Sequence, residues 1–428
     1  MSTWIRIISI LTLSLLPHQL LIAADIRYNA GLSFAHYDNL NLESSPDDNA
    51  TSSSVNAGFT ILDDNADLFI SLDTDVVYTN YNNNQARDEV SADQVANVIW
   101  RLRPGQFEWH LNNRYTQTVI DAFSSDTPNN RQNINIFSTG PNYTIRLNSN
   151  SNLQLELRGE NYNFEEDLDN NRAQFAFRLL HNLNAAWTIT FNNEVQTINY
   201  MNNDISDLNR NDLFIGMDYV HGLNYFNAEF GYTNASNDSS ASNEVDSNRY
   251  LLSITNARTR NTSIRFIYEN ILSDAGTEIA ASNIDDNLNA STSDTLANDI
   301  FIDEVYRFQV MNELSNGNIV YGISTTNREY KLQIDLDEEI NTATIDGVLN
   351  LGRAHDLAYN LGYVETAFQN STLERIDKDY IYRLTYSYGY FRNTNINLEL
   401  ETQERISTIE LESYEDLRFI LSLNFTSS

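Results

Sequence analysis

The chain has 428 residues and a formal net charge of −33, from 26 basic and 59 acidic side chains. Nucleic-acid binding is not expected, because phosphate recognition needs clustered Lys and Arg. There are no cysteines, which excludes disulfides and thiolate metal sites and suits an oxidising compartment. With only 5 prolines and 15 glycines and no shift in composition, the chain is expected to form one unit without a flexible linker.

The first segment, residues 1–24, differs from the rest. A basic residue, Arg6, precedes the apolar run 7–16, and the segment ends in two alanines before Asp25. This pattern predicts a secretory signal peptide, with residues 25–428 as the mature chain. A membrane anchor is the alternative, but the run is too short to span a bilayer, and a proline and two polar residues separate it from the next apolar patch.

From Asp25 onward, apolar and polar residues alternate with a period of two, which is the pattern of a strand with one apolar face. The first three apolar faces are Ile26, Tyr28, Ala30, Leu32 and Phe34, then Val55, Ala57, Phe59 and Ile61, then Leu68, Ile70, Leu72, Val76 and Tyr78. The last three are Tyr380, Tyr382, Leu384, Tyr386 and Tyr388, then Ile396, Leu398 and Leu400, then Leu417, Phe419, Leu421, Leu423 and Phe425. About 20 such segments (18 to 22) of roughly 9–14 residues are expected, the length that a tilted membrane strand needs.

Long and short connections alternate between these segments. The longer polar links are expected near residues 38–54, 82–89, 118–131, 164–171, 201–208, 236–247, 273–300, 331–339, 368–378 and 406–414. The short turns are expected near residues 63–66, 103–105, 148–151, 184–186, 221–224, 258–261, 315–317, 353–356 and 391–394. Outer-membrane barrels alternate in this way, with short periplasmic turns and longer extracellular loops.

The sequence therefore predicts an all-β, antiparallel, up-and-down transmembrane barrel in the outer membrane. An even strand number that starts and ends on the short-turn side places both termini in the periplasm. Phe425 is expected to close the barrel against the first strand, although Thr426, Ser427 and Ser428 follow it. A secreted soluble β-solenoid or sandwich is the remaining fold alternative.

Two residue types give a further indication of position. Trp100, Trp109 and Trp187 each lie next to an expected short turn, so they are candidates for an aromatic girdle at the periplasmic rim. Pro141 lies inside an expected strand. Because proline cannot donate to the ladder, a bulge or strand break is expected there.

The residues that alternate with the apolar face are expected to line a wet lumen, because charge facing lipid is costly. The candidates are Asp73, Asp75, Glu108, Arg114, Glu156, Arg158, Glu160, Glu194, Glu229, Arg265, Glu269, Arg307, Glu399, Glu401 and Arg405. One interpretation is a conduit in which acidic side chains, Glu399 and Glu401 among them, set a cation or polar-sugar preference. The other is that these charges pair across strands and stiffen the wall.

The longest link, 273–300, is expected either to fold inward as a constriction or to form an external loop.

Five histidines of the mature chain are scattered without ligand spacing, so no metal site is expected. Acidic loops at 46–49 and 283–287 could hold Ca²⁺, but solvated loops explain them equally. Nucleophile-elbow, P-loop and dinucleotide motifs do not occur, so neither enzyme activity nor a cofactor is predicted.

Two stretches resemble a known family. They are Phe123-Ser-Ser-Asp-Thr-Pro-Asn-Asn-Arg-Gln-Asn-Ile-Asn-Ile-Phe-Ser-Thr-Gly-Pro-Asn-Tyr143 and Tyr37-Asp-Asn-Leu-Asn-Leu42. Both look like segments of the uncharacterised outer-membrane β-barrels associated with the PEP-CTERM system and encoded with exopolysaccharide genes. The resemblance implies a role in exopolysaccharide or cell-envelope export, and it brings no catalytic residues.

The first functional hypothesis is therefore a porin-like or export conduit in the outer membrane. Its expected partners are outer-membrane lipid, the barrel-assembly machinery, and polysaccharide or small polar solutes. The second hypothesis is a non-conducting structural barrel whose acidic loops meet glycans or neighbouring cells.

Overall fold

The computed structural model describes residues 24–46, 49–82, 86–120, 124–166, 169–201, 207–237, 244–274, 277, 300–331, 334–369, 374–391 and 393–427. The expected signal peptide lies outside these residues, apart from Ala24. In this part of the chain, no helix is long and apolar enough to cross a bilayer.

The described residues form one antiparallel sheet of 20 strands. They are β1 (Asp25–Tyr37), β2 (Ala50–Asp64), β3 (Leu68–Tyr81), β4 (Glu89–Arg103), β5 (Phe107–Val119), β6 (Arg131–Arg146), β7 (Ser151–Phe164), β8 (Asn170–Asn182), β9 (Trp187–Tyr200), β10 (Leu208–His221), β11 (Asn224–Asn237), β12 (Glu244–Ala257), β13 (Thr262–Asp274), β14 (Ile300–Leu314), β15 (Gly317–Tyr330), β16 (Glu338–Gly352), β17 (His355–Phe368), β18 (Ile376–Phe391), β19 (Thr394–Ser407) and β20 (Tyr414–Thr426). Three short 3-10 turns lie in the longer connections: η2 (Pro128–Asn130), η3 (Ile334–Leu336) and η4 (Glu410–Glu412).

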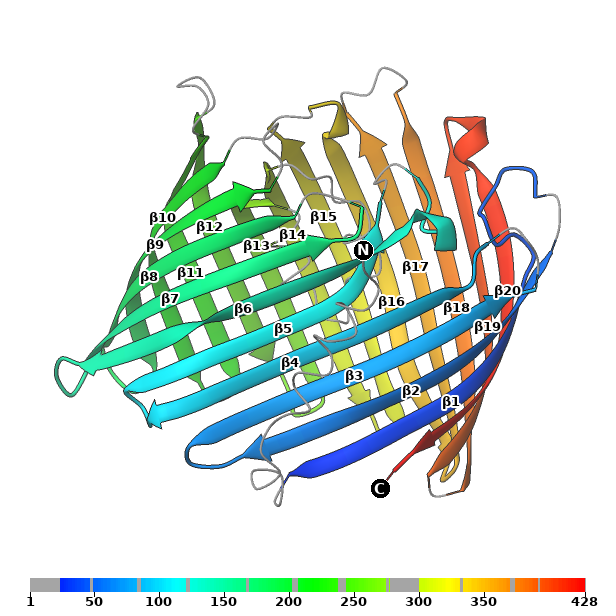
Figure 1. Ribbon diagram of the computed structural model, residues 1–428, viewed down its shortest axis with the longest axis horizontal. Helices are drawn as coiled ribbons and strands as arrows, with labels where there is room; N and C mark the ends of the chain where they lie inside the picture. Colours follow the sequence, from blue (N-terminus) through cyan, green and yellow to red (C-terminus); the bar gives the residue numbers. More distant parts are fainter. Residues whose placement is uncertain are drawn as a thin grey trace.

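Each strand pairs with its neighbours in chain order, and the sheet closes on itself (Figure 1). The closing ladder joins β1 and β20 from Asn29↔Thr426 to Tyr37↔Arg418. Phe425 lies opposite Ala30, so the predicted closure against the first strand is confirmed. The predicted all-β barrel of about 20 strands is also confirmed, and closure removes the sandwich alternative because a closed sheet has no edges.

The alternating apolar side chains of the strands face outward. Large apolar side chains are exposed on the outer face of nearly every strand, among them Leu32, Val55, Tyr78, Val90, Tyr143, Leu157, Phe175, Ile215, Phe230, Tyr306, Ile323, Leu384, Leu400 and Leu421. They meet directly across the ladders, as in Val55↔Tyr78 and Leu384↔Leu400. An exposed apolar surface that runs around a closed barrel is what lipid contact requires.

The outer face becomes polar toward the long connections. The strands have 13 to 16 residues, more than the roughly 9–11 that a tilted strand needs to cross the apolar core. The excess lies on the long-connection side, where tyrosines donate to carboxylates. The Tyr306 hydroxyl donates to Glu304 at 2.7 Å, and the Tyr363 hydroxyl donates to Glu365 at 2.8 Å. These pairs mark the border of the lipid-facing belt on the long-connection side.

Long and short connections occupy opposite ends of the barrel, and the chain's carboxyl end lies on the short-turn side (Figure 1). Their positions agree with those expected to within a few residues. Gly105 and Gly222 have φ of 72° and 60° in two of the tight turns, a conformation that glycine adopts without steric cost. Trp100 and Trp109 lie opposite each other beside the first of these turns, and the Trp187 ring packs 4.5 Å from Tyr219.

Pro141 interrupts one ladder without breaking its strand. β6 pairs with β7 at Thr139↔Gly159 and again at Asn142↔Glu156 in the same register, with no pair between. The predicted bulge or strand break is not found, because β6 is continuous and keeps one register on both sides of Pro141. Arg158 fills the gap, because its guanidinium donates to the Pro141 carbonyl at 3.3 Å.

Candidate functional site: the lumen and its narrowed mouth

The inner face of the sheet carries the residues expected in the lumen. By strand register, these candidates all lie opposite the exposed apolar face: Asp73, Asp75, Glu108, Arg114, Glu156, Arg158, Glu160, Glu194, Glu229, Arg265, Glu269, Arg307, Glu399, Glu401 and Arg405. Many are paired across strands. Arg178 of β8 lies 2.6 Å from Glu156 and 3.6 Å from Glu194. Pairing of this kind stiffens the wall, and wall charges that are already paired carry little net charge toward a solute.

One part of the wall keeps its negative charge. This acidic sector comprises Asp73 and Asp75 of β3, and Asp75 lies directly opposite Asp93 of β4. The Asn29 amide donates to Asp75 at 3.1 Å, and the Thr60 hydroxyl donates to Asp73 at 3.2 Å. Neutral donors orient these two carboxylates without cancelling their charge. The sector is therefore the part of the wall best suited to attract cations.

Five arginines near the long connections share one arrangement, here called the arginine modules. Each pairs with a carboxylate and places its guanidinium over an aromatic ring, at 4.0 to 5.6 Å from the centroid. The modules are Arg172 with Asp274 and Tyr162, Arg328 with Asp303 and Phe301, Arg375 with Asp377 and Phe368, Arg405 with Asp379 and Tyr414, and Arg418 with Asp416 and Tyr37. Because each arginine is compensated and largely buried, the modules order the wall and add little positive charge to the lumen.

Glu401 belongs to this compensated network. Its side chain is 3% exposed and lies 2.5 Å from Arg383 and 3.2 Å from Arg418. Glu399 is more open and lies 3.7 Å from Arg383. A lysine at position 401 would meet two arginines in a buried place, which is expected to impair folding before it changes selectivity. The acidic sector is therefore the better place to test ion preference.

The sequence predictions missed several members of these networks. Some alternate with the outward apolar residues in the same way as the lumen candidates, so the sequence could have identified them: Arg172, Arg178, Arg249, Arg328, Arg383 and Arg418. Others lay in stretches expected to be links, so no parity was assigned: Arg131, Asp274, Glu338, Arg375 and Asp377. Asp416 lay between the expected link 406–414 and the strand expected from Leu417. In the structure these residues lie at strand ends, except Arg375, which directly precedes β18.

On the long-connection side, the β13–β14 hairpin turns inward. The ladder between β12 and β13 ends at Tyr250↔Asn270, although both strands continue beyond these residues. Leu272 and Ile300 are buried with Ile198 of β9, Leu208 of β10 and Ala235 of β11. Arg172 holds the hairpin with two hydrogen bonds to Asp274, at 2.6 and 3.1 Å. The hairpin therefore narrows the lumen from one side. Most of the link 273–300, including 278–299, lies outside the described residues, so the two alternatives expected for it, an inward fold and an external loop, stay predictions.

Disulfide trapping in this cysteine-free chain tests the inward turn. In a continued ladder, positions 247 and 273 would be opposite, so Ser247→Cys with Ser273→Cys is expected to give no disulfide. Ser253→Cys with Ile267→Cys, and Leu252→Cys with Tyr268→Cys, are opposite in the ladder. At least one of these control pairs is expected to oxidise, because opposite Cβ atoms lie roughly 4.5–5.5 Å apart. Efficient trapping of the 247/273 pair, seen on non-reducing gels, would contradict the inward turn.

A second element crosses the mouth. The β5–β6 connection, described at residues 120 and 124–130, reaches the opposite wall and borders a cavity of about 150 Å³. Ser125, Asp126 and Arg131 line one side of this inner cavity, and Ile340 of β16 and Val364 of β17 line the other. Arg131 anchors the connection through Asp126 at 2.6 Å. This connection therefore narrows the mouth in addition to the β13–β14 hairpin.

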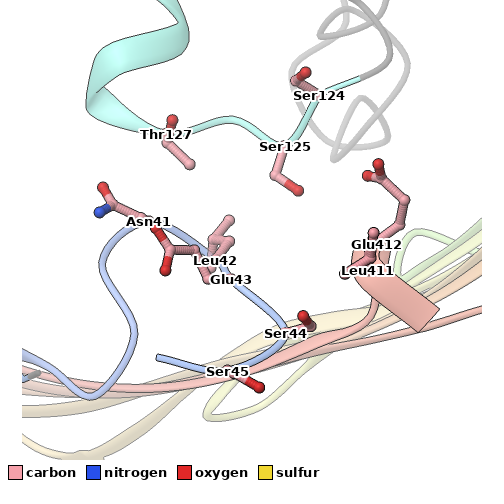
Figure 2. Close-up of a pocket in the computed structure, with 10 residues that line it drawn as sticks. All are labelled: Asn41, Leu42, Glu43, Ser44, Ser45, Ser124, Ser125, Thr127, Leu411 and Glu412. Carbon is pink, nitrogen blue, oxygen red and sulfur yellow. The ribbon is translucent and has the colours of Figure 1, made fainter. Parts of the chain in front are cut away.

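Above the crossing lies an outer cavity of about 380 Å³, shown in Figure 2. The described parts of three connections far apart in the sequence meet there: 38–46, 124–130 and 408–413. The lining residues are Asn41, Leu42, Glu43, Ser44, Ser45, Ser124, Ser125, Thr127, Leu411 and Glu412. The two stretches that carry the family resemblance thus converge at the mouth, as far as they are described.

The described residues contain no group of three His, Cys, Asp or Glu side chains placed to hold a metal ion. The acidic stretches 47–48 and 283–287 lie outside these residues, so their proposed affinity for Ca²⁺ stays a prediction.

No family model matches the chain, and no curated protein matches it. Solved structures do match. A variant of the ferric enterobactin receptor PfeA from Pseudomonas aeruginosa has a TM-score of 0.50 at 8% identity, with 94% of this chain and 80% of that chain covered. Another PfeA variant, in complex with enterobactin, also has a TM-score of 0.50 at 8% identity, with 94% and 81% covered. The fold is that of an outer-membrane β-barrel.

The match to the outer membrane protein opdK from Pseudomonas aeruginosa covers 99% of that chain and 94% of this one, at 9% identity and a TM-score of 0.42. At such identities the likeness concerns the fold alone, so the function has to be argued from the wall and the mouth of this chain.

Proposed function

We propose that the chain is a porin-like barrel of the outer membrane that conducts small polar solutes through its lumen. The observation that carries the proposal is the contrast between the two faces of one closed sheet. Apolar side chains cover the outside, whereas charged and amide side chains cover the inside. A barrel of this size is wide enough for an aqueous path.

The proposal includes an orientation. The short turns and both ends of the described barrel, Asp25 and Thr426, lie on one side, which we place in the periplasm because outer-membrane barrels have short turns there. Residues 1–24 then act as a secretory signal, and the barrel-assembly machinery inserts the chain. The mouth with its two cavities faces outward.

A narrower proposal links the conduit to exopolysaccharide or cell-envelope export. It rests on the resemblance of 123–143 and 37–42 to the PEP-CTERM-associated barrels, and the meeting of these stretches at the mouth supports a shared role for them. We also propose that the chain is not an enzyme. The alternative function is a non-conducting structural or surface-interaction barrel, favoured by the connection that crosses the mouth.

Planar-bilayer recording of the refolded mature chain tests the conduit. Heat modifiability on SDS gels first establishes that the barrel is folded. Stepwise conductance is then expected at each insertion. A folded, inserted barrel that never conducts, even after the crossing connection is replaced, would exclude the conduit and leave the structural barrel.

The acidic sector is expected to give the channel a cation preference. Asp73→Asn combined with Asp75→Asn removes two charges that only neutral donors hold, so the reversal potential in a KCl gradient is expected to move toward zero. The control is Glu156→Gln combined with Arg178→Gln, which removes one charge of each sign from an existing pair, so the reversal potential is expected to stay nearly unchanged. An unchanged reversal potential in the double variant would show that the sector does not set selectivity.

A further inference from the structure

The outer and inner cavities of the mouth are separated by a thin partition. Leu42, Ser124 and Ser125 line both of them. The serines present small hydroxyl groups, so Leu42 is the bulky part of the partition. A solute that moves from the outer cavity to the inner one has to pass this side chain.

The chain holds Leu42 in an unusual conformation. Its φ is 53°, a left-handed conformation that is costly for a branched side chain and ordinary for glycine. Asn39 fixes the turn: its carbonyl accepts the Leu42 N–H at 3.2 Å, and its side-chain oxygen accepts the Glu43 N–H at 2.9 Å. The Asn39 backbone N–H also donates to the buried carboxylate of Asp416 at 2.8 Å. Strain retained at a rigid turn is typical of a residue whose position matters for function.

The chemistry of the lining indicates the class of solute. The outer cavity presents serine and threonine hydroxyls, an amide and the carboxylates of Glu43 and Glu412. In the inner cavity, Arg375, Arg405 and Arg418 each already bind an aspartate. An anion therefore finds no uncompensated cation among these lining arginines and meets the carboxylate of Glu43 at the mouth, whereas Glu412 is paired with Arg375 at 3.3 Å. A neutral solute rich in hydroxyl groups can donate to the carboxylates and accept from the hydroxyl and guanidinium groups.

We propose that the two cavities form one binding and access path for a small neutral polyhydroxylated solute, with Leu42 as the barrier between them. This inference rests on the proposed conduit and specifies its solute class and its gating side chain. The site lies on the long-connection side, so the solute binds from that side.

The test compares glucose with glucuronate, which share a ring and differ by one carboxylate. Added on the long-connection side of a single channel, glucose is expected to reduce the current, and an equal block by glucuronate is expected to need about tenfold more solute because of one like-charge contact. Glucose added on the short-turn side is expected to block less. Leu42→Gly, which suits the backbone, is expected to raise the conductance severalfold and weaken the block. Leu411→Ala is the control, because this exposed leucine lines the outer cavity alone.

The outcomes separate this inference from the function on which it rests. A conducting channel that glucose does not block, or that glucuronate blocks equally well, overturns the solute class while the conduit stands. An unchanged conductance in folded Leu42→Gly overturns the barrier. A folded barrel that conducts in no variant removes the conduit and the inference together.

Discussion

Replacing residues 124–130 by a Gly-Ser segment of equal length is expected to raise single-channel conductance roughly threefold or more, because the lumen of a barrel this wide is limited by what folds into it. The replacement removes η2 and the Asp126 carboxylate that anchors the connection to Arg131. It also opens the inner cavity, whose far wall belongs to β16 and β17. The measurement is the distribution of conductance steps in planar bilayers.

The control for this experiment is a Gly-Ser replacement of the tight turn 183–186, which lies at the opposite end of the barrel. Its conductance is expected to match that of the natural chain. If the mouth variant also keeps the natural conductance, the narrowest point lies elsewhere, and the inward β13–β14 hairpin becomes the first place to look.

Arg328→Ala is expected to have the largest effect on stability. The guanidinium bonds both oxygens of Asp303, at 2.8 and 2.9 Å, and Glu338 at 3.0 Å. Removing it leaves two buried carboxylates facing each other without a cation, which is expected to cost about 3–5 kcal/mol of the free energy of unfolding. The measurement is the urea midpoint at which the heat-modifiable band disappears from unheated gels.

Two variants control this prediction. Arg27→Ala removes an arginine whose pair with Asp25 is exposed, so its midpoint is expected to stay close to that of the natural chain. Combining Arg328→Ala with Asp303→Asn and Glu338→Gln removes the uncompensated charges and is expected to recover part of the loss. A midpoint for Arg328→Ala equal to that of Arg27→Ala would show that the module contributes little to stability.

Strand number, the outward and inward faces and the order of short and long connections were all predictable from the period-two pattern. Successive side chains of a strand point to opposite faces, so the face on which a residue lies follows from the local sequence. Ile26 to Phe34 and Leu417 to Phe425 therefore identified two lipid-facing strands, and closure of a barrel required them to meet. The strand ends were predicted less well, because above the apolar belt both faces become polar and parity loses its contrast.

The mouth was decided by tertiary structure. Arg172 and Asp274 are 102 residues apart, and Asn39 and Asp416 are 377 apart, so no local pattern relates them. Their meeting depends on the curvature of the closed wall and on which connections turn inward. The alternation of apolar and polar residues predicts that Glu401 faces the lumen. Only the packed wall shows that it lies between two arginines. A period of two specifies the side of a sheet, whereas the partners of a charge depend on strands brought together by closure.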